Sequence, residues 1–109
     1  MNTSRPFLLL RARVKPGASV GFDQWFDAVH VRDVAKIPGI AKVMAGRTSN
    51  GTRLGIYSFE STDVVQAALG SPQAAYARGT WERWQPDLEE LLIELWASVL
   101  PMGIYAGIN

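Results

Sequence analysis

The chain has 109 residues, of which 48% are hydrophobic, and this is enough to build one core but not two. We therefore expect a single domain over residues 1–109. Eleven basic residues against ten acidic ones leave a net charge of +1, which argues against nucleic acid or an anionic membrane surface as the partner.

The absence of cysteine excludes disulfides, thiolate catalysis and cysteine-based metal sites, and a single histidine leaves little else to bind a metal ion. We expect neither a metal nor a cofactor. The apolar run at residues 7–10 is too short for a secretory signal, and no stretch reaches the roughly 18 to 20 apolar residues of a membrane span. The sequence thus predicts a cytoplasmic protein with no membrane segment.

A strand followed by a long helix opens the chain. Residues 8–15 alternate between apolar and mostly basic side chains, which is typical of a half-buried strand. Pro16 and Gly17 end it, and Ser19 or Gly21 can cap a helix that runs to about Lys36. Its apolar positions recur at helical spacing: Phe22, Trp25, Phe26, Val29, His30, Val34 and Ile37. We expect the opposite face, with Asp23, Gln24, Asp27 and Arg32, to point mostly toward water.

A hairpin and a broken helix follow. Residues 40–47 and 53–60 read as strands, and the Asn50-Gly51 pair between them predicts a tight primed turn in which both residues have positive φ. A second helix runs from residue 61 to residue 69. Ser71 and the proline after it restart a short helix that ends near residue 77.

Residues 80–100 fit two patterns, a helix of period 3.6 and an alternating strand. We assign a helical turn to residues 80–90 and a fourth strand to residues 91–99, because three strands would leave the sheet incomplete. The acidic residues Asp87, Glu89 and Glu90 are then expected on a solvated helical face. The apolar tail at residues 102–109 is expected to pack against a partner subunit.

This order of elements predicts an α+β fold: a ferredoxin-like, four-stranded antiparallel sheet with helices on one face. The other face of the sheet also carries apolar side chains. Two copies that pair these faces across a twofold axis would form an α/β barrel, so we expect a homodimer.

The chain resembles the EthD-like branch of the dimeric α/β-barrel superfamily. The resemblance rests on the order of several short motifs over most of the chain: Trp25-Phe26, His30, Ile37-Pro38-Gly39-Ile40, Leu54-Gly55-Ile56-Tyr57-Ser58-Phe59-Glu60, Ser71-Pro72 with Tyr76, and Trp81. It implies a cleft between helices and sheet that binds small aromatic or polyketide-like molecules. Some members of the superfamily act there without a cofactor as isomerases, cyclases or oxygenases, and others bind haem.

His30 is the leading candidate for chemistry, because an imidazole on the apolar helix face can act as general acid or base toward an enolisable or phenolic ligand. Tyr57 can orient a carbonyl or a phenol beside it. For both residues, a buried structural role with a satisfied hydrogen bond is an equal alternative. Trp25, Phe26, Phe59 and Trp81 are the candidate ligand-binding residues, although most aromatic residues at such spacing belong to the core.

Two functions remain open at this stage. The first is a cofactor-independent isomerase, cyclase or oxygenase that acts on a small hydrophobic or aromatic metabolite, with His30 as acid or base. The second is a non-catalytic ligand-binding or accessory dimer. A cavity at His30 and Tyr57 would favour the first, and a cleft filled by side chains would favour the second. Haem binding through His30 is a weaker third alternative.

Overall fold

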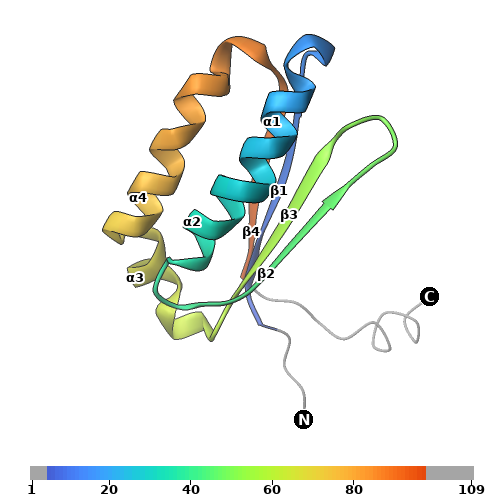
Figure 1. The fold of residues 1–109 in the computed structure, drawn as a ribbon. Helices are drawn as coiled ribbons and strands as arrows, with labels where there is room; N and C mark the ends of the chain where they lie inside the picture. Colours follow the sequence, from blue (N-terminus) through green and yellow to red (C-terminus); the bar gives the residue numbers. More distant parts are fainter. Residues whose placement is uncertain (1–4, 98–109) are drawn as a thin grey trace, which may run out of the picture.

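The computed structural model describes residues 5–97. Its centre is a four-stranded antiparallel sheet in the order β2-β3-β1-β4, with the helices on one side (Figure 1). This is the ferredoxin-like α+β fold that the sequence predicts. The prediction for residues 102–109 lies outside the described residues.

The central strand β1, Phe7–Val14, pairs with β3 on one side and with β4 on the other. Its alternation is as predicted: Leu10, Ala12 and Val14 are buried under the helices, whereas Arg11 faces away from them. Each inward side chain here is apolar and small enough for helices to pack directly on the strand.

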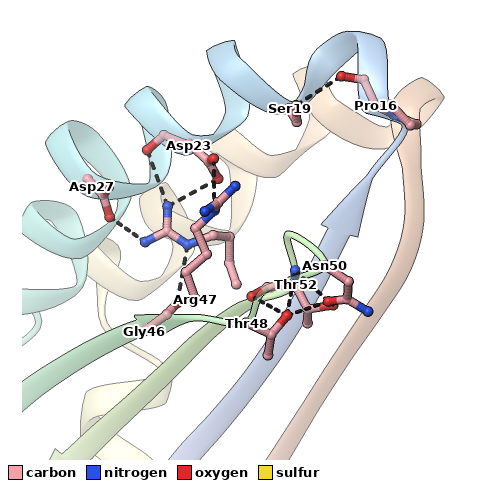
Figure 2. Close-up of polar contacts among 10 residues, drawn as sticks. Pro16, Ser19, Asp23, Asp27, Gly46, Arg47, Thr48, Asn50 and Thr52 are labelled. Carbon is pink, nitrogen blue, oxygen red and sulfur yellow. Dashed lines mark hydrogen bonds and ion pairs between the residues drawn. The ribbon is translucent and has the colours of Figure 1, made fainter.

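The strands β2, Ile40–Arg47, and β3, Arg53–Phe59, form the predicted hairpin. Its turn differs from the prediction, because only Gly51 has a positive φ, of 88°. The Gly51 amide donates to the Thr48 carbonyl and the Thr48 amide donates to the Thr52 carbonyl. Asn50 can therefore keep ordinary backbone angles while its side chain accepts from Thr52 (Figure 2), so the longer turn replaces the primed one.

The first helical segment is continuous from residue 19 to residue 35, close to the predicted range. It comprises α1, Ser19–Trp25, a π-helical turn η2, Phe26–His30, and α2, Val31–Ala35. A short 3-10 turn η1, Pro16–Ala18, precedes it. The predicted cap is wrong: Ala18 stands at the N-cap, since Ser19 lies inside the helix and its hydroxyl donates to the Pro16 carbonyl.

The second helical segment begins with η3, Thr62–Val64, and α3, Val65–Leu69. It resumes at α4, Pro72–Gly79, where the Ser71 side chain accepts from the Ala74 amide as the sequence predicts. Figure 1 shows α4 beside α1 and α2 on the same side of the sheet. In residues 5–97, no helix is both long and apolar enough to cross a membrane.

The last part of the described chain departs from the predicted boundary. A 3-10 helix η4, Thr80–Asp87, is followed at once by β4, Leu88–Trp96. The strand therefore begins three residues earlier than we predicted. Glu89 and Glu90 lie on β4 and not on a helix, because this segment pairs with β1 from Leu88 onward; both also form ion pairs with Arg13 on β1, at 3.4 and 3.2 Å.

The sheet face without helices carries both apolar and charged side chains. The strand register places these apolar side chains on it: Phe7, Leu9, Met44, Leu54, Ile56, Leu92 and Trp96. The charged ones on the same face are Arg11, Arg13, Lys42, Glu90 and Glu94. The rings of Phe7 and Trp96 stack there with centroids 6.0 Å apart. On β4 the opposite face is exposed as well, with Leu91, Ile93 and Leu95 each at least 44% accessible. A single subunit thus leaves a broad apolar surface uncovered.

Candidate functional site

The centre of the candidate site is a hydrogen bond between the helical layer and the sheet. Nε2 of His30 and the hydroxyl of Tyr57 lie 2.6 Å apart, and each residue is only 3% exposed. His30 ends the π-helical turn η2, and Tyr57 projects from β3 toward the helices. The two candidate catalytic residues are therefore brought into direct contact.

Aromatic rings surround this pair. The ring of Trp25 stacks on His30 at 5.3 Å, Phe26 lies at 4.9 Å, and Trp81 meets His30 edge-on at 5.0 Å. All three side chains are buried. They are three of the four residues that the sequence singled out as ligand-binding, and here they form the walls around His30.

Phe59, the fourth, is placed differently. It is fully buried on the same face of β3, one inward position beyond Tyr57. Within residues 5–97 its ring has no stacking or edge contact with the His30 cluster. Trp84 joins the group instead, with its ring 5.7 Å from that of Trp25 and 5.2 Å from that of Phe22.

The cluster is closed in the single subunit. His30 and its neighbours fill the space between helices and sheet, and Trp81 is the most accessible of its buried rings at 8%. A pocket of about 240 Å³ lies elsewhere, between α2 and α4, with a lining of Asp33, Lys36, Pro72, Gln73 and Tyr76. The expected open cleft at His30 is thus occupied by side chains.

Burial keeps both members of the polar pair uncharged. It lowers the pKa of His30 from 6.5 to about 4. Burial likewise raises the pKa of Tyr57 above its ordinary value, against a smaller opposing effect of the charge on Arg53. At neutral pH the site therefore holds a neutral imidazole and a neutral phenol.

The second ring nitrogen of His30, Nδ1, is buried without a hydrogen-bond partner among the described residues. If Tyr57 donates its proton to Nε2, then Nδ1 carries the ring proton and is the one unsatisfied group. If Nε2 donates to Tyr57 instead, both Nδ1 and the phenolic proton lack partners. The first arrangement leaves fewer buried groups unsatisfied and is favoured.

A buried arginine supports this site, and the sequence analysis missed it. The side chain of Arg53 is 5% exposed, lies 4.5 Å from the centroid of the Phe26 ring, and forms ion pairs with Asp23 and Asp27. Figure 2 shows both aspartates pointing from the helix toward the sheet, with Arg47 beside Asp23. The prediction that this face points mostly toward water is therefore wrong for Asp23, whose side chain is 27% exposed, but it holds for Asp27, which is 61% exposed despite its ion pair.

The signal for Arg53 was present in the alternation of β3. Arg53, Gly55, Tyr57 and Phe59 occupy every second position and share the inward face. A charged residue on a core-facing register requires a buried partner. The facing helix supplies two carboxylates one turn apart.

Gly55 makes room for the Tyr57 hydroxyl. A Cβ atom built at Gly55 would lie 2.5 Å from Cζ of Tyr57 and would also collide with its hydroxyl oxygen. The tyrosine ring therefore folds back over a position that only glycine can occupy without displacing it. Gly46 on β2 has no such constraint, since its nearest neighbour is the Cβ atom of Leu54 at 3.9 Å.

No group of three or more histidine, aspartate or glutamate side chains within residues 5–97 is arranged to hold a metal ion. The arrangement offers a neutral hydrogen-bonding pair in an apolar enclosure. Such a pair can polarise a carbonyl oxygen or accept a proton from a phenol.

The buried neutral histidine predicts a specific loss of stability in mild acid. Its pKa in the folded state, about 4, lies below the unfolded value of 6.5, so the unfolded chain takes up a proton first as the pH falls. Between pH 7.5 and pH 5, this proton uptake lowers the free energy of unfolding by about 2 kcal/mol. Urea unfolding at both pH values measures it, and His30→Gln should remove most of the difference. An unchanged difference in that variant would contradict the assignment.

Comparison by sequence gives no relatives: no protein-family model matches the chain, and no functionally curated protein is similar to it. Comparison of the fold finds similar solved structures. Rv0793 from Mycobacterium tuberculosis superposes with a TM-score of 0.65 at 15% identity, over 90% of this chain and 95% of its own. An ethyl tert-butyl ether D (EthD) family protein from Bacillus halodurans superposes with a TM-score of 0.60 at 17% identity, over 82% of this chain and 96% of its own.

A third similar structure is SnoaB, a cofactor-independent oxygenase from Streptomyces nogalater. Its TM-score is 0.66 at 17% identity, over 91% of this chain and 97% of its own. Identities in this range establish the fold. The chain therefore has a ferredoxin-like fold similar to that of an EthD-family protein and of SnoaB, as the resemblance to EthD-like proteins predicted.

Proposed function

We propose that this protein is a cytoplasmic homodimer that binds a small hydrophobic or aromatic metabolite between its helices and its sheet. His30 and Tyr57 supply the polar contact, Trp25 and Phe26 supply apolar walls, and Trp81 closes the site, with Phe59 farther along the floor of the sheet. In this proposal, ligand binding involves no cofactor, and neither nucleic acid nor a membrane is a partner.

The observation that carries this proposal is the His30–Tyr57 hydrogen bond inside an aromatic enclosure. An apolar site with a few fixed polar groups is the usual design of a small-molecule site. The free Nδ1 of His30 gives a ligand one unsatisfied hydrogen-bonding group to bind. Because side chains fill the enclosure in the single subunit, binding without chemistry takes precedence over catalysis.

Catalysis is the second candidate, supported by the direct His30–Tyr57 contact inside an apolar enclosure. With Tyr57 donating to Nε2, the Nδ1–H group of His30 can polarise a carbonyl oxygen. The opposite tautomer offers Nδ1 as a base to a phenolic hydroxyl. Either role suits a cofactor-free isomerase, cyclase or oxygenase, and SnoaB, with a similar fold, is a cofactor-independent oxygenase.

Ligand binding can be tested with 1-indanone and 2-naphthol, a bicyclic ketone and a bicyclic phenol, by calorimetric titration. We expect the wild-type protein to bind at least one of them. Tyr57→Phe removes one hydrogen-bonding group and should weaken binding about fivefold to tenfold. Gly55→Ala, which displaces the Tyr57 ring, should weaken it at least as much, whereas the matched control Gly46→Ala should not. No binding of either probe at its solubility limit would contradict the proposal.

Catalysis can be tested separately, because 1-indanone exchanges the protons next to its carbonyl with solvent when it enolises. Proton NMR in deuterated water should show faster exchange with the wild-type protein if His30 acts as acid or base. His30→Gln should abolish this acceleration while leaving most of the affinity. Binding without accelerated exchange would establish the non-catalytic candidate for this class of ligand.

The homodimer is proposed because Leu9, Met44 and Ile56 lie side by side on the uncovered sheet face. We expect light scattering to show a dimer at micromolar concentration, with a total buried interface above about 1,200 Å². Ile56→Glu would bury a charge at the middle of this face and should produce monomers. Val20→Glu, at a position 71% exposed on α1, is the matched control and should remain dimeric. A monomeric wild-type protein would contradict the proposal.

A further inference from the structure

The segment that closes the aromatic enclosure is η4, and two indoles hold it in place. Trp81 and Trp84 are its buried side chains, which share one face because residues three apart in a 3-10 helix are eclipsed. Most of its other side chains are exposed: Glu82, Arg83, Gln85 and Pro86. Side-chain anchoring in the middle of η4 therefore depends on two tryptophans.

The backbone of η4 is fixed at its ends and weak between them. The Thr80 hydroxyl donates to the Ala77 carbonyl at 2.8 Å, and the Lys15 amide donates to the Asp87 carbonyl at 2.8 Å. Between these points the chain stays in 3-10 geometry for eight residues. Such runs rarely exceed three or four residues because their hydrogen bonds are poorly aligned. The middle of η4 is thus held less firmly than its two ends.

Two unsatisfied nitrogen atoms lie in the same aromatic cluster. Nε1 of Trp84 and Nδ1 of His30 are both buried without a partner among residues 5–97. Trp81 and Trp84 contact the Trp25 ring, and Trp81 also contacts His30. A buried donor without an acceptor destabilises the state that buries it. Opening at η4 would allow both nitrogens to bind water or a ligand.

The Trp81 indole occupies the position that a flat ligand would take. It meets His30 and Trp25 edge-on, each with centroids 5.0 Å apart, and lies 6.4 Å from Phe26 and 5.8 Å from Phe22. We propose that Trp81 is the internal occupant of the binding site and that η4 releases it when a ligand binds. A flat, indole-sized aromatic molecule then takes its place against His30 and Trp25.

The hydrogen bonding of His30 specifies the polar group of this ligand. With Tyr57 donating to Nε2, Nδ1 is a donor that needs an acceptor. The ligand should therefore carry a carbonyl or another acceptor oxygen at the edge that faces His30. 1-Indanone and indane form a suitable pair of probes, because they match in size and differ in the carbonyl oxygen.

This inference rests on the proposed binding function, so the experiment separates the two. 1-Indanone is titrated into the wild-type protein, Trp81→Ala, and the control Gln85→Ala, whose side chain is exposed on η4 and does not anchor it. Removal of the internal occupant should make Trp81→Ala bind roughly tenfold more tightly or better, since no energy is spent on opening. Gln85→Ala should bind as the wild-type protein does. In Trp81→Ala, 1-indanone should bind more tightly than indane, and adding His30→Leu should abolish that preference.

The other outcomes are equally distinct. If the wild-type protein binds 1-indanone and Trp81→Ala binds no better, the ligand site is elsewhere and the inference is wrong, while the proposed binding function stands. If no variant binds the probe, both are wrong for this ligand class. Equal affinity for indane and 1-indanone in Trp81→Ala would overturn the assignment of an acceptor oxygen facing His30.

A measurement on the wild-type protein avoids dependence on a variant that fails to fold. Indole N–H signals in a proton–nitrogen NMR spectrum report each tryptophan separately. Addition of 1-indanone should shift the Trp81 signal along the same saturation curve as the calorimetric titration, whereas Trp96, on the far face of the sheet, should not follow it. An unmoved Trp81 signal at saturation would overturn the proposal.

Discussion

The hydrogen bond between His30 and Tyr57 is the point at which the helical layer and the sheet must fit each other most closely. Apolar packing tolerates small shifts, but a buried bond of 2.6 Å does not, because breaking it leaves two polar groups in a dry interior. Gly55 provides the space for the phenol, and Arg53 fixes the adjoining helix through Asp23 and Asp27. Residues of the first helix and of β3, more than twenty positions apart in the sequence, thus together support the His30–Tyr57 hydrogen bond.

Much of the fold could be predicted from the sequence, because burial on one face imposes a period. The alternation in residues 8–14 and the spacing of Phe22, Phe26 and His30 identified β1 and the first helix, and Ser71 marked the start of α4. The errors lie where local patterns are ambiguous. Glu89 and Glu90 suit a helix surface as well as a strand, and what distinguishes the two is pairing with the distant strand β1, through its backbone and through Arg13.

The residues that form the candidate site could be predicted from the sequence, but whether they leave a cavity could not. The inward positions of His30, Trp25 and Trp81 follow from periodicity and from the resemblance, and the structure brings them together with Tyr57. Whether those side chains leave a cavity depends on the volumes that pack between two layers, and a one-dimensional pattern contains no such information. The role of Arg53 was missed for a related reason, because its partners lie on another element.

The outermost strand β4 has a consequence for the behaviour of the isolated chain. It is a nine-residue edge strand with no proline, and five of its apolar side chains remain exposed. Long apolar edges are templates for pairing with other strands and hence for aggregation. From Leu91 to Trp96, Glu94 alone interrupts the apolar run, on the open face opposite Leu9. The carboxylate of Glu94 has the position of a gatekeeper charge, which opposes pairing of this strand with another.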